Sequence, residues 1–182
     1  MALLRQRKGQ IVPKYVAFLR GINVGGNCKI PMADLRLLCA SITSDPGVRT
    51  YIGSGNLVFN ATEPLADQIA GGIKDRFGFD VPIVVLAASE MRQVLADCPY
   101  AGAAGNTVHG YLCLETPNVD RVKIDSLKAP TEQVSVMGRT VWLFAPDGVG
   151  RSKLAAKMET CIGPATARNL NTLTKMVKML DD

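Results

Sequence analysis

Cationic and amide side chains surround glycines near the N-terminus of the sequence, a combination typical of anion binding. After a short apolar run the chain continues with Arg20, Asn23, Gly25, Gly26 and Lys29. Glycines let backbone N–H groups approach an anion closely, and the side chains around them supply further donors. We therefore expect this glycine loop to form one wall of an anion site. The alternative is a flexible connection in which the glycines only permit positive φ angles.

The glycine loop lacks the residues that nucleotide hydrolysis requires. Gly21 and Gly26 have the spacing of a phosphate-binding P-loop, but Asn27 and Cys28 stand where that motif has Lys and Ser or Thr. The dinucleotide pattern G-x-G-x-x-G is also missing. The loop therefore predicts simple anion binding, without the machinery of a nucleotide hydrolase.

A second cationic cluster lies where a helix is expected to begin. Arg151, Ser152 and Lys153 follow a glycine-rich turn, and Ser152 is the expected N-cap of a helix over about 152–162. A helix N-terminus carries unpaired N–H groups and a partial positive charge, so it attracts anions and disfavours nearby cations. The two cations therefore indicate a bound anion that offsets the repulsion.

The same mismatch recurs at the last predicted helix, over about 167–181. Arg168 and Asn169 fall in its expected first turn, and Asn171 lies on its polar face. Asparagine is a poor helix former that is better tolerated as a cap or a contact. We expect these three residues to bind the same anion. The alternative is a pair of ordinary amphipathic helices with solvated polar faces.

Ser54 and Asn56 belong to a Gly-Ser-Gly-Asn loop between two predicted strands, 48–52 and 57–59. Gly and Asn tolerate left-handed backbone conformations, so the structural interpretation is a tight hairpin. A contribution of Ser54 and Asn56 to the ligand site is the alternative. In a ferredoxin-like order this hairpin loop is expected at the end of the sheet opposite the glycine loop, so the two need not share a ligand.

Residues suited to covalent or metal chemistry are scarce. The sequence contains one histidine, His109, and five cysteines without a C-x-x-C pair, so few residues are available to ligate zinc. No two carboxylates are recognisable as a general acid/base pair. The sequence identifies no catalytic residue and leaves open whether the protein is an enzyme; we expect no metal and no cofactor.

The predicted elements that position these residues follow a β-α-β-β-α-β order up to residue 88, which is the ferredoxin-like order. The second half echoes it as β-α-β-β-α plus one C-terminal helix. We therefore predict an α+β fold in one compact body, with a flexible N-terminal extension over 1–13, a ferredoxin-like lobe over 14–88 and a second α+β lobe over 89–182.

The net charge of +5 is concentrated at the two ends of the chain. Residues 1–30 hold six Lys/Arg and no acid, and residues 151–182 hold six Lys/Arg against three Asp/Glu. This distribution favours an anionic partner if the fold brings the ends together; a basic tail and a solvated helix are the alternative. No apolar stretch approaches the roughly 20 residues of a membrane span, and the N-terminus lacks signal-peptide features, so we expect a cytoplasmic protein without a membrane partner.

Five stretches of the chain resemble one family. They are K-Y-V-A-F-L-R-G-I-N-V-G-G, K-I-P-M-A-D-L-R, V-R-T-Y-I-G-S-G-N-L-V-F, P-D-G-V-G-R-S-K-L and P-A-T-A-R-N-L-N-T. In this order they are similar to an uncharacterised bacterial family known as domain of unknown function 1697, over nearly everything after Pro13. The resemblance implies an α+β fold with a ferredoxin-like N-terminal part and no particular reaction. Gly53 and Leu170 stand where family members usually carry Gln and Trp, so a ligand of the family would be bound differently here or not at all.

The leading functional hypothesis is a binding module for a small phosphorylated or other anionic ligand. Its candidate ligand-binding residues are Arg20, Asn23, Gly25, Gly26, Lys29, Ser54, Asn56, Arg151, Ser152, Lys153, Arg168, Asn169 and Asn171. A nucleic-acid binder is one alternative, although the third predicted strand lacks the basic and aromatic residues of RNA-recognition domains. An enzyme acting on a phosphorylated substrate and a ligand-free dimerising protein are the others, and the sequence leaves the oligomeric state open.

Overall fold

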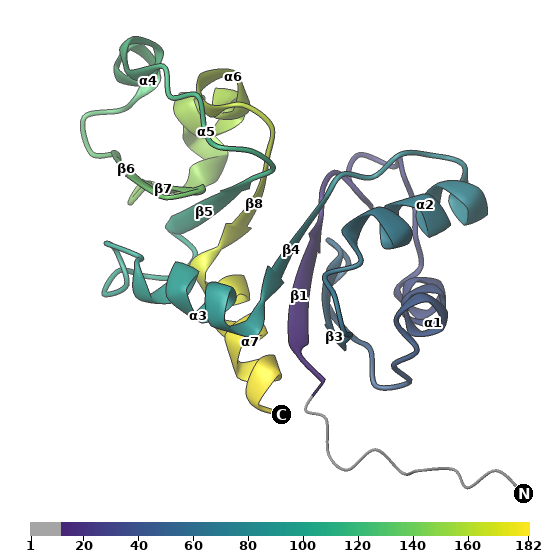
Figure 1. The fold of residues 1–182 in the computed structure, drawn as a ribbon. Coiled ribbons are helices and arrows are strands. Elements are labelled where there is room, and N and C mark those ends of the chain that lie inside the picture. Colours follow the sequence, from purple (N-terminus) through teal and green to yellow (C-terminus); the bar gives the residue numbers. More distant parts are fainter. Residues whose placement is uncertain (1–11) are drawn as a thin grey trace, which may run out of the picture.

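The computed structural model describes residues 12–182 and contains two four-stranded sheets (Figure 1). Residues 1–11 lie outside this range, and with them most of the predicted N-terminal extension over 1–13. None of the helices within residues 12–182 is long and apolar enough to cross a membrane. The division of the chain into lobes near residue 88 stays a prediction, and the two halves are named here by their sheets.

The N-terminal sheet has the ferredoxin-like topology that the sequence predicts. Its strands lie in the order β2-β3-β1-β4, and every neighbouring pair is antiparallel. Helix α1 connects β1 to β2, and α2 connects β3 to β4. The elements are β1 (Lys14–Leu19), α1 (Met32–Thr43), β2 (Arg49–Tyr51), β3 (Asn56–Asn60), α2 (Ala66–Phe77) and β4 (Ile83–Ala87).

Alternation along the strands decides which side chains face these helices. Ala17 and Leu19 of β1 point to one face of the sheet and are fully buried against α1 and α2. Leu35 of α1 and Ile69 of α2 meet them there. Val16 lies on the opposite face, together with Phe18, and belongs to a second core between the two sheets.

The C-terminal sheet repeats the same topology, with strand order β6-β7-β5-β8 and antiparallel pairs throughout. Helix α4 connects β5 to β6, and two short helices separate β7 from β8. The elements are β5 (Val108–Cys113), α4 (Arg121–Leu127), β6 (Gln133–Met137), β7 (Thr140–Phe144), the 3-10 turn η1 (Val149–Arg151), α5 (Lys153–Lys157), α6 (Glu159–Ile162) and β8 (Ala165–Asn169).

Strand β8 corrects the prediction that Arg168 and Asn169 begin a helix. Residues Ala165–Asn169 pair with β5, and the last helix, α7 (Leu170–Asp181), begins only at Leu170. The side chains of Thr166 and Arg168 are both buried, as expected when alternate residues of a strand share a face. The second half is therefore a complete β-α-β-β-α-β unit followed by a helix.

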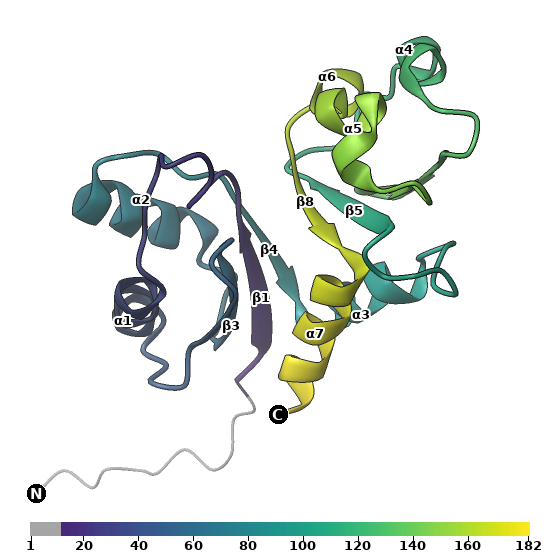
Figure 2. The ribbon, with the colours of Figure 1, turned by 180° about the vertical axis from the view of Figure 1, so that it is seen from behind.

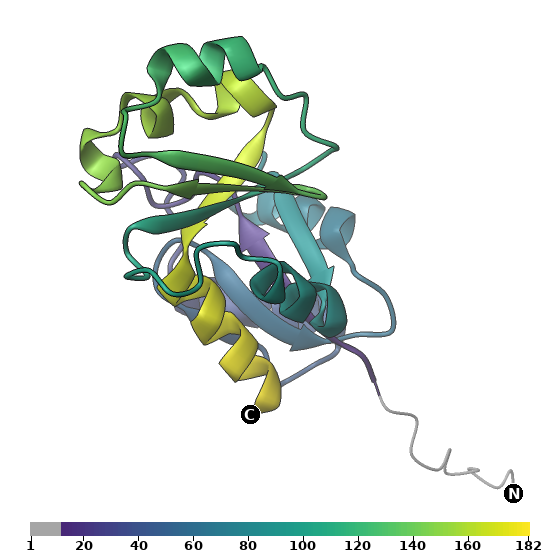
Figure 3. The same cartoon turned by 90° about the vertical axis from the view of Figure 1, so that its left-hand side faces the viewer.

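Two helices lie between the sheets and join them. Helix α3 (Ala88–Ala96) follows β4 and packs against β1 and β4, while α7 contacts β1, β3, β5 and β8. Figures 1 and 2 show α3 and α7 between the sheets, with α1 and α2 outside the N-terminal sheet and α4 to α6 outside the C-terminal one. The side view in Figure 3 shows α3 and α7 together beneath the C-terminal sheet.

Candidate functional site

Arg168 is buried between the two sheets and uses all of its hydrogen-bond donors there. Its side chain is 9% exposed. The Nε donates to Oδ1 of Asn56 at 2.5 Å, and Nη2 donates to the carbonyl oxygens of Leu19 and Ser54, each at 2.8 Å. The Nη1 donates to Oγ1 of Thr166 and to the carbonyl of Ala167. Because a guanidinium has five N–H donors, none remains for an anion.

Burial lowers the pKa of Arg168 to about 10, so this side chain keeps its charge at neutral pH. All five acceptors are neutral oxygens, and the guanidinium also lies 5.7 Å from the centre of the Phe18 ring. The arginine therefore stabilises the contact between the sheets through hydrogen bonds and a cation–π contact, without a carboxylate partner.

Asn56 is the partner of Arg168 in the N-terminal sheet, and it is fully buried. Its Oδ1 accepts from Arg168, while its Nδ2 donates to the carbonyl of Tyr51 and to Oγ of Ser54. The side-chain amide thus closes the β2–β3 hairpin and joins it to β8. Ser54 contributes a carbonyl and a hydroxyl to these contacts.

The hairpin loop lies at the same end of the sheet as the glycine loop, so the prediction of opposite ends is wrong. Strand β3 runs antiparallel to β1, and therefore its first residue, Asn56, pairs with Phe18 near the end of β1. The N–H of Leu19 donates to the carbonyl of Gly55 at 2.8 Å. Nδ2 of Asn23 reaches the carbonyl of Gly53 at 2.7 Å.

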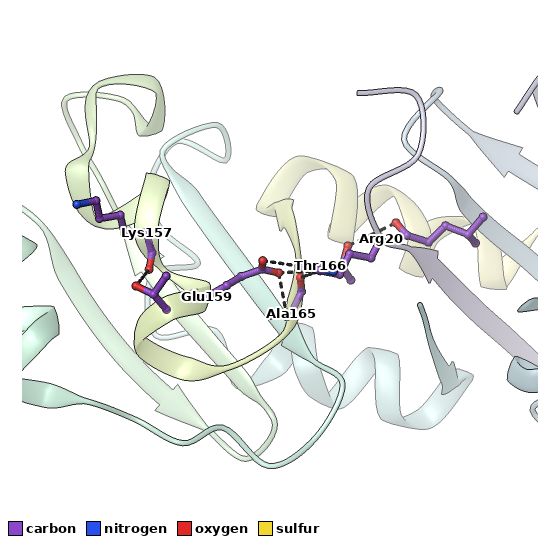
Figure 4. A network of polar contacts seen from close by, with 7 residues as sticks. Arg20, Lys157, Glu159, Ala165 and Thr166 are labelled. Atoms are coloured by element: carbon purple, nitrogen blue, oxygen red, sulfur yellow. Dashed lines mark hydrogen bonds and ion pairs between the residues drawn. The ribbon is translucent and has the colours of Figure 1, made fainter. Parts of the chain in front are cut away.

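Arg20 forms an ion pair with a residue that the sequence reading did not select. Its Nε and Nη2 donate to the two carboxylate oxygens of Glu159 at 2.8 and 2.6 Å, and Nε also reaches the carbonyl of Ala165. Figure 4 shows the carboxylate of Glu159 directed toward Ala165 and Arg20, and the N–H of Ala165 donates to this carboxylate at 3.1 Å. The hydrogen bond from Arg20 lowers the pKa of Glu159 below its ordinary value, and the same bond raises the pKa of Arg20.

These contacts form one polar junction between the sheets, comprising Arg20, Ser54, Asn56, Glu159, Thr166 and Arg168. The junction brings together three of the stretches that the sequence singled out: the one that ends β1, the β2–β3 loop and the one that forms β8. Most polar groups of these side chains are paired with one another or with nearby backbone carbonyls. Their geometry is that of a structural contact between the two halves of the chain.

The glycine loop is held by Asn23. The Oδ1 of Asn23 accepts from the N–H of Ile30 at 2.8 Å, and its Nδ2 donates to the carbonyl of Ile30. Gly25 and Gly26 have φ angles of 60° and 83°, the turn conformation that glycine adopts readily. Lys29 is exposed and lines an open hollow with Asn23 and Gly26, and its ammonium has no hydrogen-bond or ion-pair partner among residues 12–182.

Of the residues predicted at helix starts, only Arg168 belongs to the polar junction, and the others have separate roles. Ser152 caps α5 as predicted, its Oγ accepting from the N–H of Ala155 at 2.9 Å. Arg151 and Lys153 beside it are exposed. Asn169 is the N-cap of α7, because its Oδ1 accepts from the N–H of Thr172. Asn171 is exposed near Gly105.

A pocket of about 280 Å³ lies between the two sheets, away from every residue of the predicted ligand set. We call it the inter-sheet pocket. One wall comes from β4 and α3, and the other from β5 and the β6–β7 hairpin. Its lining residues are Val84, Leu86, Glu90, Gln93, Val94, Asp97, Leu112, Cys113, Met137, Gly138, Arg139, Thr140 and Trp142.

Most of this lining is apolar, and the polar groups are few. Trp142 is fully buried, and its indole N–H has no hydrogen-bond partner among the described residues. Arg139, in the turn between β6 and β7, is exposed; its Nη2 donates to the carbonyls of Cys113 and Leu114. This leaves the Nε and Nη1 of Arg139 without a partner in the described part of the chain. Apolar walls with a few placed donors are typical of small-molecule sites.

The described residues provide no evident catalytic or metal-binding group. They contain no cluster of three or more His, Cys, Asp or Glu side chains that could hold a metal ion. Burial raises the pKa of the Cys113 thiol to about 11, so it is not a thiolate nucleophile at neutral pH. Burial also lowers the pKa of His109, the only histidine of the sequence.

Sequence reasoning missed this pocket because its walls come from segments far apart in the chain, and ordinary core residues make up most of them. Two local signals were available. Trp142 is the only tryptophan of the sequence. Gly110, directly opposite it on β5, is closely packed, because a Cβ there would lie 3.1 Å from the indole ring and 3.0 Å from Leu173.

Comparison with known proteins assigns the chain to a family and supports the fold. The chain belongs to the family described as "Protein of unknown function (DUF1697)", whose model matches residues 12–142. It is similar to a conserved bacterial protein, SP0830 from Streptococcus pneumoniae, with a TM-score of 0.70 and 22% sequence identity over 94% of this chain and 99% of that one. No protein with a curated description matches it. The resemblance inferred from the motifs is thus confirmed at the level of the family.

Proposed function

We propose that the protein is a binding module for a small organic molecule, which lies in the inter-sheet pocket with an anionic group on Arg139. The observation that carries this proposal is the pocket itself: about 280 Å³ of space between two sheets, with apolar walls and an arginine at the rim. The proposal keeps the small anionic ligand that the sequence predicts and moves its site from the helix starts to this pocket.

The arrangement of Arg139 supports the anionic part of the proposal. Two backbone carbonyls hold its Nη2, so the guanidinium is positioned before a ligand arrives. The residue has no carboxylate partner within residues 12–182. A fixed guanidinium loses little conformational freedom on binding, and its free Nε–H and Nη1–H groups can each donate a charge-assisted hydrogen bond to a carboxylate or phosphate.

The apolar walls support the organic part. Val84, Leu112 and Trp142 are buried, and Leu86 and Val94 are half-buried around the same space. An apolar group placed there would be removed from water, which stabilises the complex by about 25 cal/mol for each Å² buried. Inorganic phosphate gains nothing from such walls, so the proposed ligand has an apolar body.

The other functional classes gain less support from the geometry. RNA-recognition domains stack bases on an open sheet face. Here helices pack against both faces of each sheet in the described chain, and Tyr100 stacks on Phe144 of β7. An enzyme on a phosphorylated substrate lacks an identified nucleophile. Anion binding at Lys29, or at Arg151 and Lys153, remains a separate hypothesis that the same experiment can detect.

A thermal-shift screen with a pocket-filling variant tests the proposal. The panel pairs apolar carboxylates and phosphate esters with inorganic phosphate, nucleotides and a short single-stranded RNA. Val94→Phe places a larger ring into the pocket from α3, and Lys153→Gln is the control for a cation outside it. A ligand at 100 times its Kd raises stability by about 2.7 kcal/mol, or several degrees in Tm for a chain of this size.

We expect an apolar anion to raise Tm in the wild type and in Lys153→Gln, and to lose that effect in Val94→Phe. Circular dichroism and the Tm of each ligand-free variant establish that it is folded. A shift that survives Val94→Phe and disappears in Lys153→Gln would overturn the proposal in favour of the α5 region. A flat response of the wild type to the whole panel would also count against it.

A further inference from the structure

The inter-sheet pocket is lined by charges of both signs that do not pair with each other. Glu90 and Asp97 lie on one side, on and just after α3, and Arg139 lies on the other, in the β6–β7 turn. None of the three belongs to an ion pair within 4.0 Å among residues 12–182. The opposite charges that line this cavity are therefore not paired with each other, and each can interact with a ligand.

Each of these three side chains is held in place by a hydrogen bond that leaves its charge uncompensated. Oε2 of Glu90 accepts from the N–H of Ala87 at 2.7 Å, at the start of α3. Oδ1 of Asp97 accepts from Nε2 of Gln93 at 2.8 Å. Arg139 is anchored by two backbone carbonyls. The carboxylates and the guanidinium are therefore oriented, and the charged groups keep unused atoms for a ligand.

A ligand with one charge of each sign would satisfy both sides at once. A purely anionic ligand gains contacts from Arg139 but is repelled by the two carboxylates that line the same pocket. A purely cationic ligand gains contacts from the two carboxylates but is repelled by Arg139. An amine directed to Glu90 and Asp97 and a carboxylate directed to Arg139 remove both conflicts.

We infer that the ligand of the inter-sheet pocket is a zwitterion with an apolar body, of the chemical class of an apolar amino acid or a short apolar peptide. The apolar body packs against the accessible apolar side chains of the lining, Leu86, Val94 and Met137. This inference rests on the proposed function, because it assumes that the pocket is the binding site. It adds a positively charged group to the anionic ligand of the proposed function, and it thereby specifies the ligand class.

A matched set of probes that share one apolar body isolates the contribution of each charge. The probes are L-leucine as the zwitterion, 4-methylpentanoate as the anion, 3-methylbutylamine as the cation and 4-methylpentanamide as the neutral compound, with the dipeptide leucyl-leucine as the longer zwitterion. Binding is measured by isothermal titration calorimetry on the wild-type chain. We expect at least one zwitterion to bind at least tenfold more tightly than each singly charged probe and the neutral one.

Two sets of substitutions assign the charges to residues. Arg139→Gln is expected to weaken the zwitterion about tenfold while leaving the amine unchanged or tighter. Glu90→Gln with Asp97→Asn is expected to weaken the zwitterion to a similar degree and to strengthen 4-methylpentanoate. Glutamine at position 90 can still accept the hydrogen bond from Ala87, so α3 keeps its start. Lys153→Gln, outside the pocket, is expected to change none of these affinities.

The possible outcomes separate this inference from the proposed function. Equal affinities for the zwitterions and 4-methylpentanoate, both abolished by Val94→Phe, would overturn the zwitterion and leave the pocket in place. The zwitterion would also be overturned if an unrelated anion from the thermal-shift panel bound in the pocket while every leucine-derived probe failed. Failure of every probe and of the whole panel would overturn both.

Discussion

The two regions where the sheets meet differ in almost every respect. The polar junction is closed: Arg168 is 9% exposed and all five of its N–H donors have acceptors. The inter-sheet pocket is open space of about 280 Å³ with apolar walls, and Arg139 at its rim keeps donors unused. Arg168 has no donor left for a ligand, whereas Arg139 keeps its Nε and Nη1 donors free among the described residues.

This contrast shows that a conspicuous polar motif can be structural. Arginine, asparagine and glycine stand out in a sequence because they suit anion binding, but the same donors suit a contact between two backbones whose carbonyls need partners. In the polar junction these donors form a contact between the two sheets. Space for a ligand occurs instead in the inter-sheet pocket, which is lined mostly by ordinary apolar side chains. The comparison predicts that changes at the junction alter stability and that changes at the pocket alter binding.

The largest effect is expected for Arg168→Ala. It leaves the carbonyl of Ser54 and the Oδ1 of Asn56 without the guanidinium donor, and it removes the 2.8 Å bond to the carbonyl of Leu19, which keeps only a 3.5 Å contact from Oγ1 of Thr166. Each buried group left unsatisfied costs about 1–3 kcal/mol. We expect the free energy of unfolding to fall by about 3 kcal/mol or more in denaturant titration.

Arg168→Lys serves as the second variant if the alanine form does not fold. It keeps the charge but has too few donors for these acceptors, so it should retain only part of the lost stability. Arg151→Ala, at an exposed position, is the matched control and should change stability by less than about 0.5 kcal/mol. Equal effects of the substitutions at 168 and 151 would contradict the structural role of the junction.

A smaller effect of opposite sign is expected for Ile52→Asn, in the hairpin loop of the junction. Ile52 has a φ of 52° and is half-exposed, and this left-handed conformation is unfavourable for a β-branched residue. Asparagine adopts it more readily, so the free energy of unfolding should rise by about 1 kcal/mol. Thermal unfolding measures the change. A lower Tm for Ile52→Asn would show that the isoleucine side chain supplies packing that outweighs the strain.

The smallest effect is expected for Glu159→Gln, because the ion pair with Arg20 is exposed to water, with side chains 40% and 37% exposed. The folded state lowers the pKa of Glu159, so the stability that it contributes is present above the ordinary pKa and is lost as the pH falls through the lowered value. At neutral pH the substitution should cost about 0.5–1 kcal/mol after screening by solvent.

The pH dependence of the unfolding free energy distinguishes the contribution of this ion pair from overall destabilisation of the protein by acid. The difference in unfolding free energy between wild type and Glu159→Gln should shrink as the pH is lowered from neutrality to about 3. Denaturant titrations at several pH values measure it. A difference that stayed constant down to that pH would mean that the carboxylate charge does not contribute.

The fold was predictable to the extent that it depends on local patterns. The apolar runs, the helix of residues 32–43 and the turn at Gly138 and Arg139 follow from side-chain periodicity and turn residues. Strand β8 was not predictable in this way, because Thr-Ala-Arg-Asn is polar and lies directly before an amphipathic helix. Its strand conformation depends on pairing with β5, more than fifty residues earlier in the chain.

The candidate site was harder to predict than the fold. A charged residue such as Arg168 is rarely buried unless its donors are satisfied, and the acceptors that satisfy it come mainly from the other sheet. The pocket likewise exists only after β4 and α3 have been placed opposite β5 and β7. Trp142 and Gly110 stand out in the sequence, but no local motif shows that their strands border a cavity.

The most direct test of the account uses Trp142 as a built-in reporter. It is the only tryptophan of the chain and it lines the inter-sheet pocket, so its fluorescence reports on that space without a label. The titration uses the panel compound that gives the largest thermal shift, on wild type, Val94→Phe and Lys153→Gln. The account predicts a saturable change in emission for wild type and Lys153→Gln and none for Val94→Phe. Binding that raises Tm in all three proteins while Trp142 emission stays constant would place the ligand elsewhere and contradict the account.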